Sequence, residues 1–162
     1  MTLAQLCLAG ETNPLGIGIP QYTWLWPAIE SLHVISLTVL VISIVSFDLR
    51  LARLAFGKLA LNVYARRALP VTWGAFALMV TTGTLLFMPF GYRNYCFNAA
   101  FRLKLLLLLA AGVNMGIFHL RYRSLAKLDE VEKNPLAVNF AAFSSIALWL
   151  GVIAAGRFIG FV

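Results

Sequence analysis

Charged side chains are scarce in this sequence. Asp, Glu, Lys and Arg make up 12% of the 162 residues, against about 25% in a typical soluble domain. Hydrophobic residues make up 61%, against about 45–50%, and one soluble domain of this length cannot bury such an excess. The excess must face lipid, which excludes an ordinary soluble domain and predicts a membrane protein.

Several signals of other protein classes are also missing. Residues 1–23 contain no Lys or Arg, so the positively charged start of a cleavable signal peptide is absent. The sequence has no basic stripe with interleaved aromatic residues, so we expect no nucleic-acid partner. It has no nucleophile with an adjacent base, phosphate-binding loop or nucleotide motif, so we assign no catalytic residue.

Four long apolar stretches are present instead. A transmembrane helix needs about 20 largely apolar residues. The sequence offers them at residues 27–48, 69–90, 102–121 and 136–158. Pro27, Pro70 and Pro135 stand near the starts of three stretches, where proline suits the first turn of a helix. We predict an all-α membrane protein, a single domain over residues 1–162 folded as a four-transmembrane-helix bundle.

Basic residues are distributed unevenly between these stretches. The first and third connections hold Arg50, Arg53, Lys58, Arg66, Arg67, Arg121, Arg123, Lys127 and Lys133. The second connection and its flanks hold only Arg93, Arg102 and Lys104. Since cytoplasmic loops carry the excess of Lys and Arg, both termini are predicted on the outer (periplasmic) side of a bacterial inner (plasma) membrane. Residues 1–26 are then an irregular periplasmic tail, with Pro14 and Gly16 among its helix breakers.

The two cysteines, Cys7 and Cys96, both fall on this predicted outer side. That compartment is oxidising in bacteria, so a disulfide is a candidate. Two unpaired thiols are the alternative, because the sequence supplies no distance between them.

Four ionisable residues lie near the outer ends of the predicted spans: Glu30, His33, Lys104 and Arg157. Ionisable groups inside a membrane are costly and indicate function by default. Glu30 lies one helical turn from His33 on the same face. Lys104 either extends to the lipid headgroups or points inward at His33 or a cofactor.

His33 is the central candidate of this cluster, as a ligand for heme iron or a metal. A hydrogen-bonded Glu30–His33 pair that fixes helix packing is the structural alternative. A di-iron site would need more carboxylates, and a copper site would combine His33 with Met88 and Cys96. The candidate cofactor-binding residues are His33, Lys104, Glu30, Arg157 and Met88, and the candidate metal ligand is His33.

Asp48 and His119 lie near the opposite, cytoplasmic ends of their spans. They are candidates to pair with each other or with neighbouring arginines. His33 and His119 differ in depth by about 20 Å at the helical rise per residue, which argues against one heme ligated by both histidines.

Several motifs resemble an uncharacterised bacterial family of four-span membrane proteins: Glu30-Ser31-Leu32-His33-Val34, Thr82-Gly83-Thr84, Asn98 to Lys104, and Asn114 to His119. The chain is also distantly similar to heme-binding membrane protoporphyrinogen oxidases and copper-resistance inner-membrane proteins. In the oxidases a first-span histidine and a lysine are associated with heme b. Carried over, that resemblance implies heme b binding at His33 and Lys104.

Three functions follow as hypotheses. The first is an accessory subunit of a larger membrane complex concerned with electron transfer, favoured by the spacings Gly112-x-x-x-Gly116 and Gly156-x-x-x-Gly160, which permit close helix contact. The second is a b-type heme electron-transfer protein with His33 as axial ligand. The third is a metal-handling protein or small-solute transporter. The expected partners are the lipid bilayer and either other membrane subunits or further copies of the chain.

Overall fold

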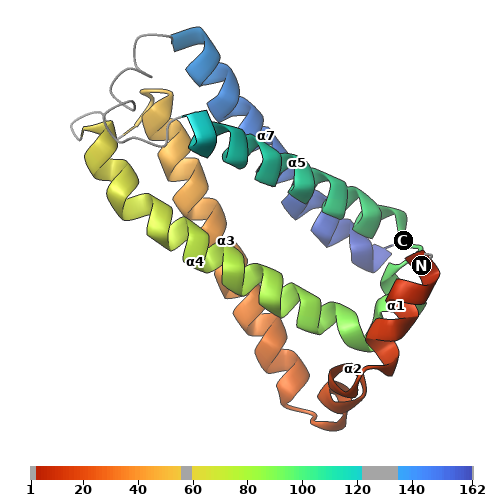
Figure 1. The fold of residues 1–162 in the computed structure, drawn as a ribbon. Helices are drawn as coiled ribbons and strands as arrows, with labels where there is room; N and C mark the ends of the chain where they lie inside the picture. Colours follow the sequence, from red (N-terminus) through yellow and green to blue (C-terminus); the bar gives the residue numbers. More distant parts are fainter. Residues whose placement is uncertain (1–2, 56–59, 122–134, 162) are drawn as a thin grey trace.

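The computed structural model describes residues 3–55, 60–121 and 135–161, which are almost entirely helical (Figure 1). Four helices are long and apolar enough to cross a membrane. They are α3 (Leu25–Leu51), α4 (Leu61–Phe87), α5 (Ala99–Arg121) and α7 (Pro135–Phe158). No strand occurs in these described ranges, so the predicted all-α bundle of four transmembrane helices is confirmed.

The four helices form two hairpins that join along one side. α3 packs along α4, α5 packs along α7, and α3 also contacts α7. The remaining neighbours, α4 and α5, make little direct contact. The bundle is therefore closed along the α3–α7 side and loosely closed along the α4–α5 side.

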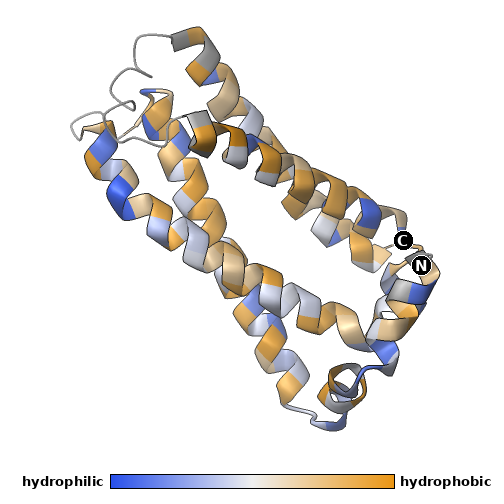
Figure 2. Ribbon diagram, viewed as in Figure 1, coloured by the Kyte–Doolittle hydropathy of each residue, from blue (hydrophilic) through white to orange (hydrophobic). Residues whose placement is uncertain are grey.

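The buried core between the hairpins is narrow. Leu40 and Trp149 are 0% and 2% exposed, and Met79 and Ala111 pack with them from the other two helices. In the most apolar stretch of α5, only 6% of the residues are buried inside the bundle. Hydrophobic residues run along the long helices (Figure 2), and many of them are exposed, Ile42, Leu106 and Leu109 each by 64% or 65%. This distribution fits a bundle whose outer surface meets acyl chains rather than water.

Buried hydroxyl groups link α3 to α4. Ser43 Oγ lies 2.6 Å from Thr72 Oγ1 and 3.3 Å from the backbone oxygen of Ala68. Apolar surfaces gain little by meeting each other rather than lipid, so such hydrogen bonds and close packing hold helices together in a membrane.

The helix α4 begins earlier than predicted. The apolar pattern placed the second span at residues 69–90 with Pro70 in its first turn, whereas α4 begins at Leu61 and holds Pro70 in its interior. Hydropathy missed the first turns because they carry Arg66 and Arg67, which extend the helix beyond its apolar part.

The N-terminal tail is helical, so the prediction of an irregular segment is wrong. It contains α1 (Leu3–Thr12), α2 (Pro14–Gly18) and a 3-10 turn, η1 (Ile19–Gln21). The Asn13 side chain caps α2 by accepting a hydrogen bond from the backbone N–H of Leu15 at 3.0 Å. Pro14 opens α2 and Gly18 ends it, whereas Gly16 lies inside α2, where a Cβ would collide with the backbone oxygen of Gly10.

This tail packs on the connection between α4 and α5, which consists of η2 (Met88–Phe90) and a π-helical turn, η3 (Gly91–Tyr95). A disulfide joins Cys7 to Cys96, whose Cα atoms are 6.2 Å apart, and both residues are buried. Glu11 accepts a hydrogen bond from the backbone N–H of Arg93 at 3.0 Å and pairs with its guanidinium at 3.6 Å. Both chain ends lie at this end of the bundle, called here the disulfide end (Figure 1).

Replacing Cys7 with Ser is expected to lower the free energy of unfolding by about 2–5 kcal/mol, because the bridge closes a long loop in the unfolded chain. The two cysteines are 89 residues apart in sequence. Denaturant unfolding in detergent, with and without reductant, measures the change. Reductant should destabilise the native protein and leave Cys7→Ser unaffected. Alkylation of both thiols in unfolded, unreduced protein, seen by intact mass, would contradict the bridge.

Candidate functional site

His33 lies on α3 and reaches across to α4. Its Nδ1 is 2.9 Å from Thr82 Oγ1, and the side chain is half-buried. This hydrogen bond fixes the imidazole by one nitrogen and leaves the other to face a neighbouring space.

The Thr82 hydroxyl determines which ring nitrogen carries the proton. The hydroxyl donates its single proton to the backbone oxygen of Leu78 at 2.8 Å, with the oxygen of Met79 at 3.1 Å. With that proton used, the oxygen of Thr82 is left to accept, and we assign Nδ1 of His33 as the donor on this ground. Nε2 then keeps its lone pair, the form in which histidine binds iron or another metal.

Gly83 makes room for the imidazole. A Cβ at this position would lie 3.1 Å from His33 Cε1 and 3.6 Å from Nδ1. The first distance is closer than a carbon–carbon contact normally allows. The consecutive residues Thr82 and Gly83 therefore act together, one anchoring the ring and the other giving it space.

His33 lines two adjoining cavities of about 290 and 280 Å³. We call them the central cavity and the terminal cavity, the second lying toward the disulfide end. Both are lined by His33, Gly83, Phe87, Phe101 and Lys104. The central cavity is otherwise apolar and adds Leu37, Met79, Leu108 and Val152, whereas the terminal cavity adds Tyr95, Gly156, Arg157 and Gly160. Together they reach the size of sites for cofactor-sized molecules, about 300–1,000 Å³.

Lys104 points into the bundle. Its side chain lines both cavities and runs alongside α7, where a Cβ on Gly156 would lie 3.6 Å from its Cδ, Cε and Nζ. Of the two alternatives for Lys104, the structure has the inward one rather than extension to the headgroups.

Arg157 adds a second cation to the wall of the terminal cavity. Its side chain is exposed, and its Cζ lies 5.8 Å from the centre of the Phe161 ring. Aromatic rings form the facing wall. Phe87 and Phe101 stack with their centres 5.4 Å apart and their planes 9° apart, and Tyr95 lies 5.4 Å from Phe101. The terminal cavity therefore combines flat apolar surface with two positive charges.

The central cavity opens toward lipid between α4 and α5. Val80 of α4 and Leu105 of α5 both line it, yet they are 41% and 48% exposed. Because these helices make little direct contact, a molecule dissolved in the bilayer can reach His33 from the side. The geometry suits a flat, largely apolar ligand with an anionic group at one edge.

The structure does not bring the other predicted residues into the His33 cavities. Glu30 is exposed, and its charge acts on Tyr95. Between these two described residues, the suggested Glu30–His33 hydrogen bond is not formed, since the His33 ring bonds Thr82. Met88 lines neither cavity, and its backbone lies against Gly10 and Gly16 of the tail.

The described residues contain no group of three or more His, Cys, Asp or Glu side chains that could hold a metal ion. Cys96 is in a disulfide, which removes it from the suggested copper site. A cofactor that needs one protein ligand is a better match to His33 than a bare metal ion. The side chain of His119 lies outside the described residues, and Asp48 lies at the other end of the bundle.

Sequence reasoning missed the role of the residues around His33. None of Thr82, Gly83, Phe87, Tyr95 and Phe101 was assigned to a site from the sequence. The available signal was that Thr82-Gly83 and Phe101 belong to the motifs quoted above.

Over residues 10–162 the sequence matches a family described as Family of unknown function (DUF6644). The chain belongs to this family. No curated protein and no solved structure matches the chain. The comparisons show no relationship to the protoporphyrinogen oxidases or the copper-resistance proteins.

The DUF6644 match includes every residue that lines the His33 cavities. It begins after Cys7, so one half of the disulfide lies outside it. The family match supports the predicted uncharacterised membrane family and carries no activity of its own.

In the native protein, His33 is expected to carry its proton on Nδ1. Thr82→Val removes the acceptor and should lower the free energy of unfolding by about 1–3 kcal/mol, because the donor is left unpaired. Histidine-selective ¹⁵N NMR in detergent reports the tautomer, and His33→Gln assigns the signals against His119. The neighbouring Thr81→Val is the matched control, since Thr81 donates within its own helix and is exposed. A neutral His33 with its proton on Nε2 would contradict the assignment.

Proposed function

We propose that this protein is a b-type heme protein of the membrane, with His33 as an axial ligand and a role in electron transfer. One observation carries the proposal: the Nδ1–Thr82 bond leaves Nε2 of His33 available at a cavity of cofactor size. A ligand histidine typically donates its other N–H to an oxygen that fixes the ring, and Thr82 is placed to do this.

The residues around His33 fit a heme on three counts. The central cavity is apolar, and the Phe87–Phe101 stack offers a flat surface for a macrocycle. Lys104 and Arg157 supply positive charge for the propionates, as arginine and lysine do for carboxylates generally. The opening between α4 and α5 admits an amphiphilic molecule from the bilayer. When bound, heme supplies one-electron chemistry, and the chain contributes its position, polarity and axial ligand.

Lys104 can contribute to heme binding in one of two ways. It either binds a propionate as a cation or serves as the second axial ligand through its neutral amine. Met88, the other residue suggested for that position, lies away from both cavities.

An accessory subunit is the second candidate, and α5 favours it. A Cβ on Gly112 or on Gly116 would meet no atom within 4 Å, so this pair of small residues is not used to pack the described part of the chain. It lies on a helix whose apolar surface is largely exposed. A helix of another chain could approach closely there.

Purified protein from cells supplied with heme is expected to show a Soret band. His33→Ala should abolish the band, because it removes the iron ligand. Glu30→Gln should retain it, because Glu30 is exposed and outside the cavities. Spectra of oxidised and reduced protein, together with hemin titration, provide the measurement. A colourless native protein that takes up no hemin would overturn the proposal, and a partner co-purified with it would favour the subunit.

Two Lys104 variants refine the same measurement. Lys104→Arg keeps the positive charge but cannot ligate iron, whereas Lys104→Leu loses both properties. If Lys104 binds a propionate, Lys104→Arg retains the native spectrum and Lys104→Leu weakens heme affinity. A changed spectrum in Lys104→Arg would instead assign the lysine to the iron.

We also propose that the disulfide end faces the periplasm of a bacterial inner membrane. The Lys and Arg count of the connections supports this, with nine in the first and third against three around the second. Alkaline phosphatase fused after Val162 is expected to be active, and green fluorescent protein fused there should be dark. The reverse pair of results would invert the orientation.

A further inference from the structure

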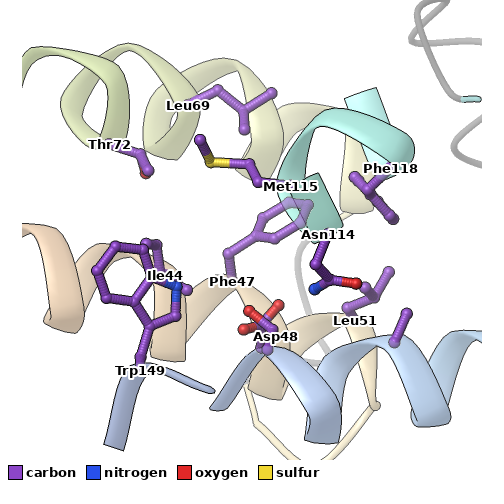
Figure 3. Close-up of a pocket in the computed structure, with 12 residues that line it drawn as sticks. Ile44, Phe47, Asp48, Leu51, Leu69, Thr72, Asn114, Met115, Phe118 and Trp149 are labelled. Atoms are coloured by element: carbon purple, nitrogen blue, oxygen red, sulfur yellow. The ribbon is translucent and has the colours of Figure 1, made fainter. Parts of the chain in front are cut away.

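A third cavity lies at the end of the bundle opposite the disulfide. It has a volume of about 50 Å³ and receives side chains from all four long helices. Its polar members are Asp48 of α3, Thr72 of α4, Asn114 of α5 and Ser145 of α7. Phe47, Phe118 and Trp149 are among its apolar walls (Figure 3).

The Asp48 carboxyl group is incompletely satisfied. The residue is 6% exposed, and its Oδ2 is buried without a hydrogen-bond partner. The hydroxyl-bearing Ser145 of α7 lines the same cavity. Figure 3 shows the side chain of Asn114 beside Asp48, with its amide nitrogen on the Asp48 side and its amide oxygen turned away. A 180° rotation of the amide exchanges these two atoms and presents the oxygen to the cavity. A buried, ionised carboxylate without a compensating charge is strongly unfavourable inside a membrane bundle.

The described lining contains no positive group to compensate that charge. No Lys, Arg or His is among the residues that line this cavity. Arg50 follows Asp48 by two residues, which places it about 200° around the α3 axis. The described lining of this cavity therefore leaves the Asp48 carboxyl group without a positive neighbour.

We propose that this cavity binds a monovalent cation, with ligands from Asp48 Oδ2, the Asn114 amide oxygen and the Ser145 hydroxyl. Hard cations take oxygen ligands of these kinds. A volume of about 50 Å³ exceeds the roughly 10–15 Å³ that one water needs, so a small cation fits with a water to complete its coordination. One positive charge neutralises one carboxylate, whereas a divalent ion would leave a buried excess of positive charge.

This site is independent of the proposed heme site. Asp48 lies fifteen residues from His33 along α3, or about 22 Å at the helical rise. Asp48 is also within one turn of the end of α3 at Leu51, so a cation reaches it from the adjacent aqueous surface. Loss of heme binding would leave the cation proposal standing, and the reverse also holds.

The test is thermal unfolding of the full chain in detergent at constant ionic strength, with Na⁺, Li⁺ or K⁺ exchanged for choline. A bound cation should raise the unfolding temperature along a saturable curve, and the three ions should differ because the cavity is small. Choline, which is too large for the cavity, should have no effect. Calorimetric titration of the metal ion alone into choline-equilibrated protein gives the affinity directly.

Asp48→Asn keeps the shape of the side chain and should abolish the saturable shift, and Asn114→Ala should weaken it. Glu30→Gln is the matched control, because Glu30 is the other acidic residue on α3 and is exposed. If Asp48→Asn does not fold, the native titration still decides. A native protein indifferent to the choice of cation would overturn the proposal and leave Asp48 holding a proton. An undiminished shift in Asp48→Asn would overturn it as well.

Discussion

The hydrogen-bonded seam between α3 and α4 is the constraint on which the site depends. Within hydrocarbon, helices gain little from burying apolar surface against each other, so polar contacts and close approach set their register. Two pairs of side chains make such contacts between the described parts of α3 and α4, His33 with Thr82 and Ser43 with Thr72. Ser43 follows His33 by ten residues, and Thr72 precedes Thr82 by ten. The two contacts therefore agree on one antiparallel register, with the imidazole and the hydroxyl pair about 15 Å apart along it.

The cavities beside this seam follow from how the two hairpins meet. α5 packs on α7, with Leu107 3.2 Å from the position a Cβ would take on Gly151, and leaves α4 largely free. At the disulfide end, Cys7–Cys96 fixes the tail to the connection after α4. Asn98 then donates from Nδ2 to the backbone oxygen of Ile159 at 3.2 Å, tying the same connection to the end of α7. The α4–α5 opening is thus bounded at the disulfide end by a disulfide and a hydrogen bond.

The sequence predicts the depth of a residue along a membrane helix better than the direction in which its side chain points around the helix axis. Depth along a helix follows from residue number and rise, so four spans and a shared level for His33 and Lys104 could be predicted. Rotation about the helix axis depends on packing, and no pattern in these nearly all-apolar helices reveals it. Glu30 therefore looked like a partner of His33 yet lies on the exposed side, and the direction of Lys104 stayed open. Both cysteines could be placed at one end of the bundle from the sequence. The distance between them depends on the fold of the N-terminal tail, and the Pro and Gly residues of that tail gave no indication that it is helical.

The described linings of the cavities at the two ends carry opposite charge. The His33 cavities have Lys104 and Arg157 and no acidic residue in their described lining, whereas the described lining of the Asp48 cavity has one carboxylate and no basic residue. Neither set can neutralise the other, because about 22 Å of apolar helix separates His33 from Asp48. Keeping charged side chains inside a membrane protein costs free energy, and burying them does not recover that free energy. The sign of the charge then indicates the ligand: an anionic, largely apolar molecule at the disulfide end and a small cation at the other. The two proposals thus rest on one argument, that each isolated charge in lipid requires a partner and the described chain does not supply it.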